Sequence, residues 1–202
     1  MTPTTHSKSQ HAGDAGFSLI ELLIAMTITL AVMVAASTLL ASSLRTRTRE
    51  NLRSTALAAA QRSLSIMSRE IGNAGYGLTD NGIIAADSSA NSIRVRANLN
   101  NDSDLDDVDE DVRFVYQSAN SEIVRYDDST ASSARSVLGT NITSLTIGYL
   151  NTAGAAVAPG SAERISIEVL VDLPAGPEQP AGVVRLVSQV ALRNAPATLQ
   201  QF

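Results

Sequence analysis

A long uncharged stretch near the N-terminus constrains this chain more than any other feature. Residues 17–44 include a single charged side chain, Glu21. About 20 apolar residues are enough to cross a bilayer as one helix. A carboxylate inside such a helix costs about 2.5–3.5 kcal/mol near its centre and less near its end. We therefore expect a membrane-spanning helix over residues 17–44, with Glu21 either at the headgroup level or paired with a cation of a neighbouring subunit.

The residues at the start of this stretch resemble a prepilin processing site. The run Gly-Phe-Ser-Leu-Ile-Glu over residues 16–21 is similar to the signal of type IV prepilins and type II secretion pseudopilins. The resemblance implies that prepilin peptidase removes residues 1–16 as a leader by cutting after Gly16, and that Phe17 is then N-methylated. It also implies that Glu21 docks on the N-terminal amine of an adjacent subunit. Such an amine, with a pKa of about 7.7–8, is mostly cationic at pH 7, and pairing compensates both charges in a low-dielectric bundle.

The charges flanking the apolar stretch favour a topology opposite to that of the family. The leader has only Lys8 and its own amino terminus as cations, with Asp14 against them. Beyond the stretch stand Arg45, Arg47, Arg49 and Arg53. The positive-inside rule would put that end in the cytoplasm. The resemblance implies instead an inner-membrane protein of a Gram-negative bacterium, with a periplasmic head that later joins a pilus at the cell surface. We follow the cleavage motif because it is far more specific than a charge count.

The composition excludes several kinds of chemistry. The chain has no cysteine, so disulfides, thiol nucleophiles and thiolate metal sites are absent. Both histidines, His6 and His11, lie in the predicted leader, which would leave the mature chain without the commonest general base. Aromatic residues make up 3% and the net charge is −5, which disfavours base stacking and nucleic-acid binding. We predict a protein that is not an enzyme and has no nucleic-acid partner.

Helical character is predicted to continue over residues 45–77, up to a glycine-rich end. This segment is rich in good helix formers up to residue 71. Its apolar residues recur every three or four positions and draw one stripe along a helix face: Leu52, Ala56, Ala60, Leu64, Met67 and Ile71. We expect Gly72, Gly75 and Gly77 to end the helix, with Gly72 as a left-handed cap. The alternative is two helices with a break at residues 42–43.

Residues 78–202 are predicted to form an antiparallel β head. Six segments alternate apolar and polar residues: 92–96, 112–116, 122–126, 142–147, 164–169 and 183–192. The short loop over 117–121 makes the second and third a hairpin, and a loop rich in proline and glycine precedes the last segment. One face of a single sheet would pack on the helix stripe. The predicted fold class is therefore α+β and pilin-like, with one long N-terminal helix packed on an antiparallel sheet.

An acidic loop over residues 98–111 holds seven of the chain's twenty acidic residues. Laid on a twelve-residue calcium loop, side-chain oxygens fall at Asn98, Asn100, Asp102, Asp104, Asp106 and Asp109. The match is imperfect, because it starts with Asn98, has Ser103 where such loops turn at glycine, and closes with the short Asp109. The alternative is a solvated hairpin tip that keeps the sheet edge soluble. No cofactor is required, and a bound calcium would be structural, ordering the loop.

Two further segments resemble PilW-type minor pilins. Residues 68–76, Ser-Arg-Glu-Ile-Gly-Asn-Ala-Gly-Tyr, are similar to the end of the PilW-type helix, and residues 190–194 to the last strand of PilW-type and J-type sequences. The resemblance implies a minor pilin that acts in pilus assembly or initiation, in a hetero-oligomeric filament with other major and minor pilins. One alternative is the J-type minor pseudopilin of a type II secretion system. Another, of a different class, is a membrane-tethered binding or adhesin head.

Overall fold

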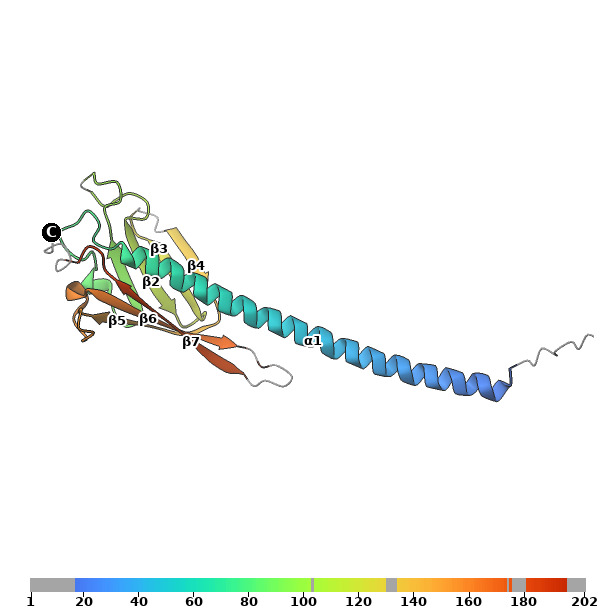
Figure 1. The fold of residues 1–202 in the computed structure, drawn as a ribbon. Helices are drawn as coiled ribbons and strands as arrows, with labels where there is room; N and C mark the ends of the chain where they lie inside the picture. Colours follow the sequence, from blue (N-terminus) through green and yellow to red (C-terminus); the bar gives the residue numbers. More distant parts are fainter. Residues whose placement is uncertain (1–16, 103, 130–133, 174, 176–180, 196–202) are drawn as a thin grey trace, which may run out of the picture. The chain divides into compact units, whose positions relative to one another are not determined.

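The computed structural model describes residues 17–102, 104–129, 134–173, 175 and 181–195 (Figure 1). The chain divides into two compact units, residues 1–45 and 46–202. The predicted leader, Gly16 and most of the proline- and glycine-rich loop lie outside the described residues. The fold is α+β, with one long N-terminal helix and antiparallel sheets, and the predicted fold class is confirmed.

A single helix, α1, spans Leu19–Gly72. Its first part lies in the first unit, where the hydroxyl groups of serine and threonine donate to carbonyl oxygens of the preceding turn. Thr29 Oγ1 donates to the Ala25 carbonyl at 2.7 Å, and Ser37 Oγ to that of Met33 at 2.7 Å. These bonds satisfy the hydroxyl donors on an otherwise apolar surface. The backbone is also helical across residues 42–43, so the alternative of two helices broken there is wrong.

The predicted stripe is buried in the second unit from Ala56 onward. Five of its six residues are at most 8% exposed and belong to the hydrophobic core: Ala56, Ala60, Leu64, Met67 and Ile71. Leu52 is 55% exposed, so the prediction is wrong at that position. The buried core along the helix begins one turn later, at Ala56. The periodicity of apolar residues identified the correct face of the helix but not the residue at which its burial begins.

The helix ends differently from the prediction. Gly72 is still helical and is not among the glycines with positive φ, so its assignment as a left-handed cap is wrong. A Cβ at that position would lie 3.3 Å from Val190 Cγ1, so the glycine allows close packing against the last strand. The left-handed positions are Gly75, with φ 77°, and Gly77, with φ 70°. They turn the chain after α1, where a side chain would be strained.

The first sheet contains four strands: β1 (Ser92–Arg96), β2 (Asp111–Gln117), β3 (Glu122–Asp127) and β4 (Ala134–Gly139). Each is antiparallel to the next, in the order β1-β2-β3-β4. Gln117 pairs with Glu122, which confirms the predicted hairpin. β4 was not predicted, because its side chains are mostly exposed and show no apolar alternation. Its pairing with β3 places it in the sheet.

The second sheet contains β5 (Ile142–Leu150), β6 (Arg164–Leu173) and β7 (Gly182–Ala191), antiparallel in that order. The prediction of one continuous sheet is therefore wrong. The division falls between β4 and β5, where Asn141 has a φ of 59° and the chain passes from pairing with β3 to pairing with β6. Two short 3₁₀ turns, η1 (Ala85–Asp87) and η2 (Pro159–Ser161), complete the described elements.

Both sheets contribute one face to a common core with the second part of α1. Phe114 of β2, Ile123 of β3 and Ile167 of β6 are fully buried there with Met67 and Ile71. Polar contacts join the same layers, as Ser68 Oγ lies 2.9 Å from Ser188 Oγ of β7. The helix end and the base of the acidic loop are thus held by one packed body (Figure 1).

Candidate functional site

The candidate assembly motif lies at the start of α1. Phe17 precedes the helix and is 83% exposed. Glu21 is exposed in the first helical turn. A negative charge there interacts favourably with the unpaired N–H groups of the helix start. The carboxylate is therefore compatible with the local backbone and open to a group from another molecule. The structure does not describe Gly16.

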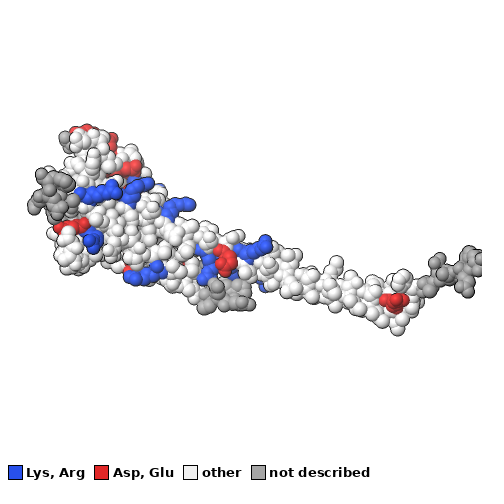
Figure 2. Space-filling model, in the orientation of Figure 1, with Lys and Arg blue, Asp and Glu red and all other residues white. Residues whose placement is uncertain are grey.

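The helix surface around Glu21 is apolar and uncovered. Large side chains from Leu19, at 87% exposure, to Leu44, at 55%, face outward. Figure 2 shows this segment as a largely uncharged surface with one acidic patch. By length and composition, α1 is one helix that could cross a membrane. Exposed apolar surface costs about 25 cal/mol per Å² in water. This segment would therefore be stabilised by burial in lipid or against the apolar faces of other helices.

The acidic loop gathers a group of carboxylates that differs from the predicted ligand set. Oxygens of Asp102, Asp104, Asp107 and Glu110 all lie within 4.8 Å of one another. We call these four residues the carboxylate cluster. It shares Asp102 and Asp104 with the set inferred from loop spacing. Asp107 and Glu110 were not inferred, and the inferred Asp106 is not part of the cluster.

Asp109, the inferred closing ligand, has a different partner. Its carboxylate accepts a hydrogen bond from Arg125 of β3, and its backbone N–H donates to Asp127 Oδ2 at 3.1 Å. Arg125 also donates from Nε to Glu70 Oε2, at the end of α1, at 2.8 Å. Asp109 has a φ of 71°, a left-handed conformation. It is therefore an anchor that ties the loop to the sheet and the helix.

Glu110 is buried at the base of the loop, directly before β2. It is 1% exposed, and its Oε1 accepts the N–H of Leu99 at 2.6 Å and that of Asn100 at 3.4 Å. Its Oε2 has no hydrogen-bond partner among the described residues, and neither has the buried Oδ1 of Asn98. In a run where seven of fourteen residues are acidic, no spacing distinguishes an inward carboxylate from an outward one. Sequence reasoning therefore missed Glu110.

The pKa is raised in two members of the cluster, Asp104 and Asp107. A hydrogen bond with Asp106, then partial desolvation and repulsion from Asp102 and Asp106, raise the pKa of Asp104. Desolvation, then repulsion from Asp102, Glu110 and Asp106, raises the pKa of Asp107. Repulsion between like charges adds to the hydrogen bond in one case and to desolvation in the other. The loop thus concentrates negative charge at one place on the head.

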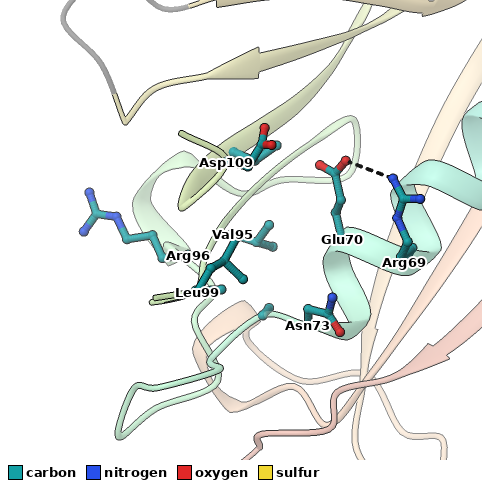
Figure 3. Close-up of a pocket in the computed structure, with 10 residues that line it drawn as sticks. Arg69, Glu70, Asn73, Val95, Arg96, Leu99 and Asp109 are labelled. Atoms are coloured by element: carbon teal, nitrogen blue, oxygen red, sulfur yellow. Dashed lines mark ion pairs between the residues drawn. The ribbon is translucent and has the colours of Figure 1, made fainter. Parts of the chain in front are cut away.

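A pocket of about 190 Å³ lies beside the loop, between the end of α1 and the strands β1 and β2. Figure 3 shows Glu70 and Asp109 on one side of it and Asn73 on another, with Val95 and Leu99 along its wall. Arg69 lies 3.9 Å from Glu70. The acidic groups at its rim, Glu70 and Asp109, are paired with arginines, and these pairs join the helix end to the loop.

Comparison with known families identifies the N-terminal segment. The family described as the prokaryotic N-terminal methylation motif matches residues 12–37. The chain carries this methylation motif. The match includes Gly16, Phe17 and Glu21, and it supports a type IV pilin or pseudopilin that is processed by prepilin peptidase and assembles with other pilins. It also supports membrane anchoring through the apolar part of α1 and a structural role rather than an enzymatic one. No curated protein matches the chain.

Proposed function

We propose that the protein is a PilW-type minor pilin of a type IV pilus, acting in the assembly or initiation of the filament. The observation that carries the proposal is the methylation motif at the start of a helix segment whose apolar side chains are uncovered. A segment of this kind is stable in the inner membrane before assembly and in a bundle of like helices afterwards. The head would lie in the periplasm first and on the pilus later.

Glu21 supplies the specificity of docking in this proposal. After cleavage, the amine of Phe17 lies four residues before Glu21, or about 6 Å along a helix axis. A neighbouring subunit shifted along the bundle can bring its own amine against this carboxylate. The pair removes two unpaired charges from an apolar environment, and loss of one partner from a buried pair costs about 3–5 kcal/mol. That cost would strongly disfavour the incorporation of a subunit that lacks Glu21.

The likeness of residues 68–76 to the PilW-type helix end favours a minor pilin over a J-type pseudopilin. In the head, Glu70 of this segment receives a hydrogen bond from Arg125, which also binds Asp109 of the acidic loop. Residues 68–76 therefore contribute an acid at the helix end, Glu70, which is joined through Arg125 to the acidic loop. A pilin head built on this contact would present the loop beside the end of α1.

The test replaces Glu21 with alanine in the native host and compares it with Glu50→Ala, an exposed acid further along the same helix. For Glu21→Ala we expect normal membrane insertion and leader removal but loss of the protein from sheared filaments. Glu50→Ala should enter filaments as wild type does. Normal incorporation of Glu21→Ala would contradict a docking role and favour a tethered head. Loss of type II secretion with normal piliation, on deletion of the protein, would favour the pseudopilin.

A further inference from the structure

The carboxylate cluster leaves its charge without a matching cation in the described part of the chain. The nearby arginines form ion pairs with acids outside the cluster: Arg125 binds Glu70 and Asp109, and Arg96 binds Asp111. Two members of the cluster accept hydrogen bonds from the side chain of Asn100, whose Nδ2 donates to Asp102 Oδ2 at 2.6 Å and to Asp107 Oδ2 at 2.5 Å. One neutral amide offsets only a small part of the repulsion among four carboxylates.

The buried carboxylate of Glu110 also points to a bound cation, independently of the charge of the cluster. A buried carboxylate oxygen is ordinarily hydrogen-bonded or bound to a cation. The two backbone donors of Leu99 and Asn100 use Oε1, whereas Oε2 is buried and has no partner among the described residues. A Glu110 oxygen also belongs to the cluster. The unsatisfied oxygen therefore belongs to a residue that faces the acids of the loop.

From this arrangement we infer that Asp102, Asp104, Asp107 and Glu110 bind a calcium ion. All four donors are oxygens, which suit a hard cation. Calcium binds oxygens at about 2.3–2.6 Å, so ligands on opposite sides of the ion are about 4.6–5.2 Å apart. Four oxygens within 4.8 Å of one another fit around one such ion. Magnesium requires about 2.0–2.1 Å and a strict octahedron, so it accepts an irregular group of carboxylates less readily than calcium does.

The site has one rigid ligand and three adaptable ones. Glu110 is fixed by the backbone donors and by its position before β2, whereas Asp102, Asp104 and Asp107 are exposed on the loop. Calcium takes six to eight oxygens, so bidentate carboxylates and water would complete its shell. Binding would draw the exposed acids onto Glu110 and order the loop next to its Asp109–Arg125 anchor. This inference does not depend on the proposed role in the pilus.

The first test uses the full chain in detergent after treatment with a chelator. Calorimetric titration should show one calcium site with a dissociation constant between about 10⁻⁵ and 10⁻³ M, and the thermal unfolding midpoint should rise with calcium. Magnesium at equal ionic strength should raise it much less. No heat and no shift up to about 10 mM calcium, or an equal shift with magnesium, would overturn the inference.

Two neighbouring substitutions separate the cluster from the pattern read in the sequence. Asp107→Asn should weaken calcium binding at least tenfold, whereas Asp106→Asn should change it by less than about threefold. Both side chains are exposed, so neither change should prevent folding. Equal losses of calcium affinity in the two variants would indicate a diffuse acidic patch. Loss of affinity with Asp106→Asn alone would indicate the ligand set inferred from the spacing of the loop. Either result would overturn the cluster as the site.

Glu110→Gln tests the buried ligand. The substituted side chain would keep an oxygen for the two backbone N–H donors and place an amide donor among the acids in place of Oε2. We expect the calcium-free variant to be at least as stable as wild type and its calcium response to be lost. If it is less stable and binds calcium as wild type does, Glu110 has only a structural role and the inference fails. If the variant does not fold, the comparison of Asp107→Asn with Asp106→Asn decides.

Discussion

Arg125 Nε donates a hydrogen bond to Glu70 Oε2 at 2.8 Å, which joins the middle of β3 to the last turn of α1. The same guanidinium binds Asp109 at the base of the acidic loop. The side chains of Arg125 and Glu70 are 13% and 22% exposed, so their contact lies largely out of water, whereas the side chain of Asp109 is 55% exposed. Desolvation and the hydrogen bond to Glu70 act in opposite directions on it, and the net effect raises the pKa of Arg125. One cation thus holds helix, sheet and loop together.

Replacement of Arg125 by glutamine should destabilise the head by about 1.5–3 kcal/mol, because hydrogen bonds to charged groups are lost from a mostly buried position. The matched control is Arg185→Gln, which removes an ion pair to Glu168 whose arginine is 64% exposed. Exposed pairs contribute about 0–1 kcal/mol. Urea denaturation of the two variants measures the difference. Equal free energies of unfolding for the two would contradict the central position of Arg125.

Gly82→Ala should be far more harmful than Gly154→Ala. Both glycines have positive φ, 68° and 82°, so each substitution carries a backbone strain of about 1–2 kcal/mol. A Cβ at Gly82 would also lie 2.1 Å from Gly75 N and 2.3 Å from Arg96 O, whereas the space at Gly154 is open. The backbone would have to move to admit it.

Thermal unfolding of the two glycine variants isolates this steric effect. Gly154→Ala should unfold a few degrees below wild type. Gly82→Ala should unfold much lower or fail to accumulate. Similar unfolding midpoints would show that the close approach of residues 75, 82 and 96 is not rigid.

The folded head should lose stability at high pH because Tyr149 ionises. Burial, partly opposed by a hydrogen bond with Ser88, raises the pKa of Tyr149 to about 12. Its hydroxyl donates to the carbonyls of Ser89 and Ser92, at 3.0 and 3.2 Å. The folded state therefore favours the neutral phenol. This contribution is complete below the ordinary pKa of about 10 and is lost as the pH rises to about 12.

Ultraviolet titration of tyrosinate measures the effect. Wild type should show one tyrosine that ionises near pH 12 or on unfolding, and Tyr149→Phe should lack it. The variant should also lose about 0.5–1.5 kcal/mol of stability at neutral pH through the missing hydrogen bonds. Ionisation of Tyr149 at its ordinary pKa in the folded protein would contradict the burial seen here.

The sequence predicted the elements whose side chains alternate between core and solvent. β6 buries every second residue, from Ile165 to Leu173, and its pattern was visible as period two. β4 has no such pattern, because its register is set by pairing with β3 rather than by burial. The division into two sheets was not predicted either, because it depends on which strands pair: at Asn141 the chain passes from pairing with β3 to pairing with β6.

The acidic loop shows a second limit of sequence reasoning. Spacing alone could propose ligands, but it could not show that Asp109 binds Arg125, a contact across 16 residues. Nor could it show that Glu110 is buried with one oxygen unsatisfied. By contrast, the motif that includes Gly16, Phe17 and Glu21 needs no tertiary structure to be found, because its residues lie close together in the sequence. The family comparison finds the same segment.

The central claim is that this chain is processed as a prepilin and assembled. Intact-mass and N-terminal analysis of the protein from native membranes and from sheared filaments tests it most directly. We predict a chain that starts at N-methylated Phe17 and is present in the filament fraction. A processed chain confined to membranes would favour a pseudopilus or an initiation complex. An intact start at Met1 or Thr2 would contradict processing and the docking of Glu21 on a new N-terminal amine.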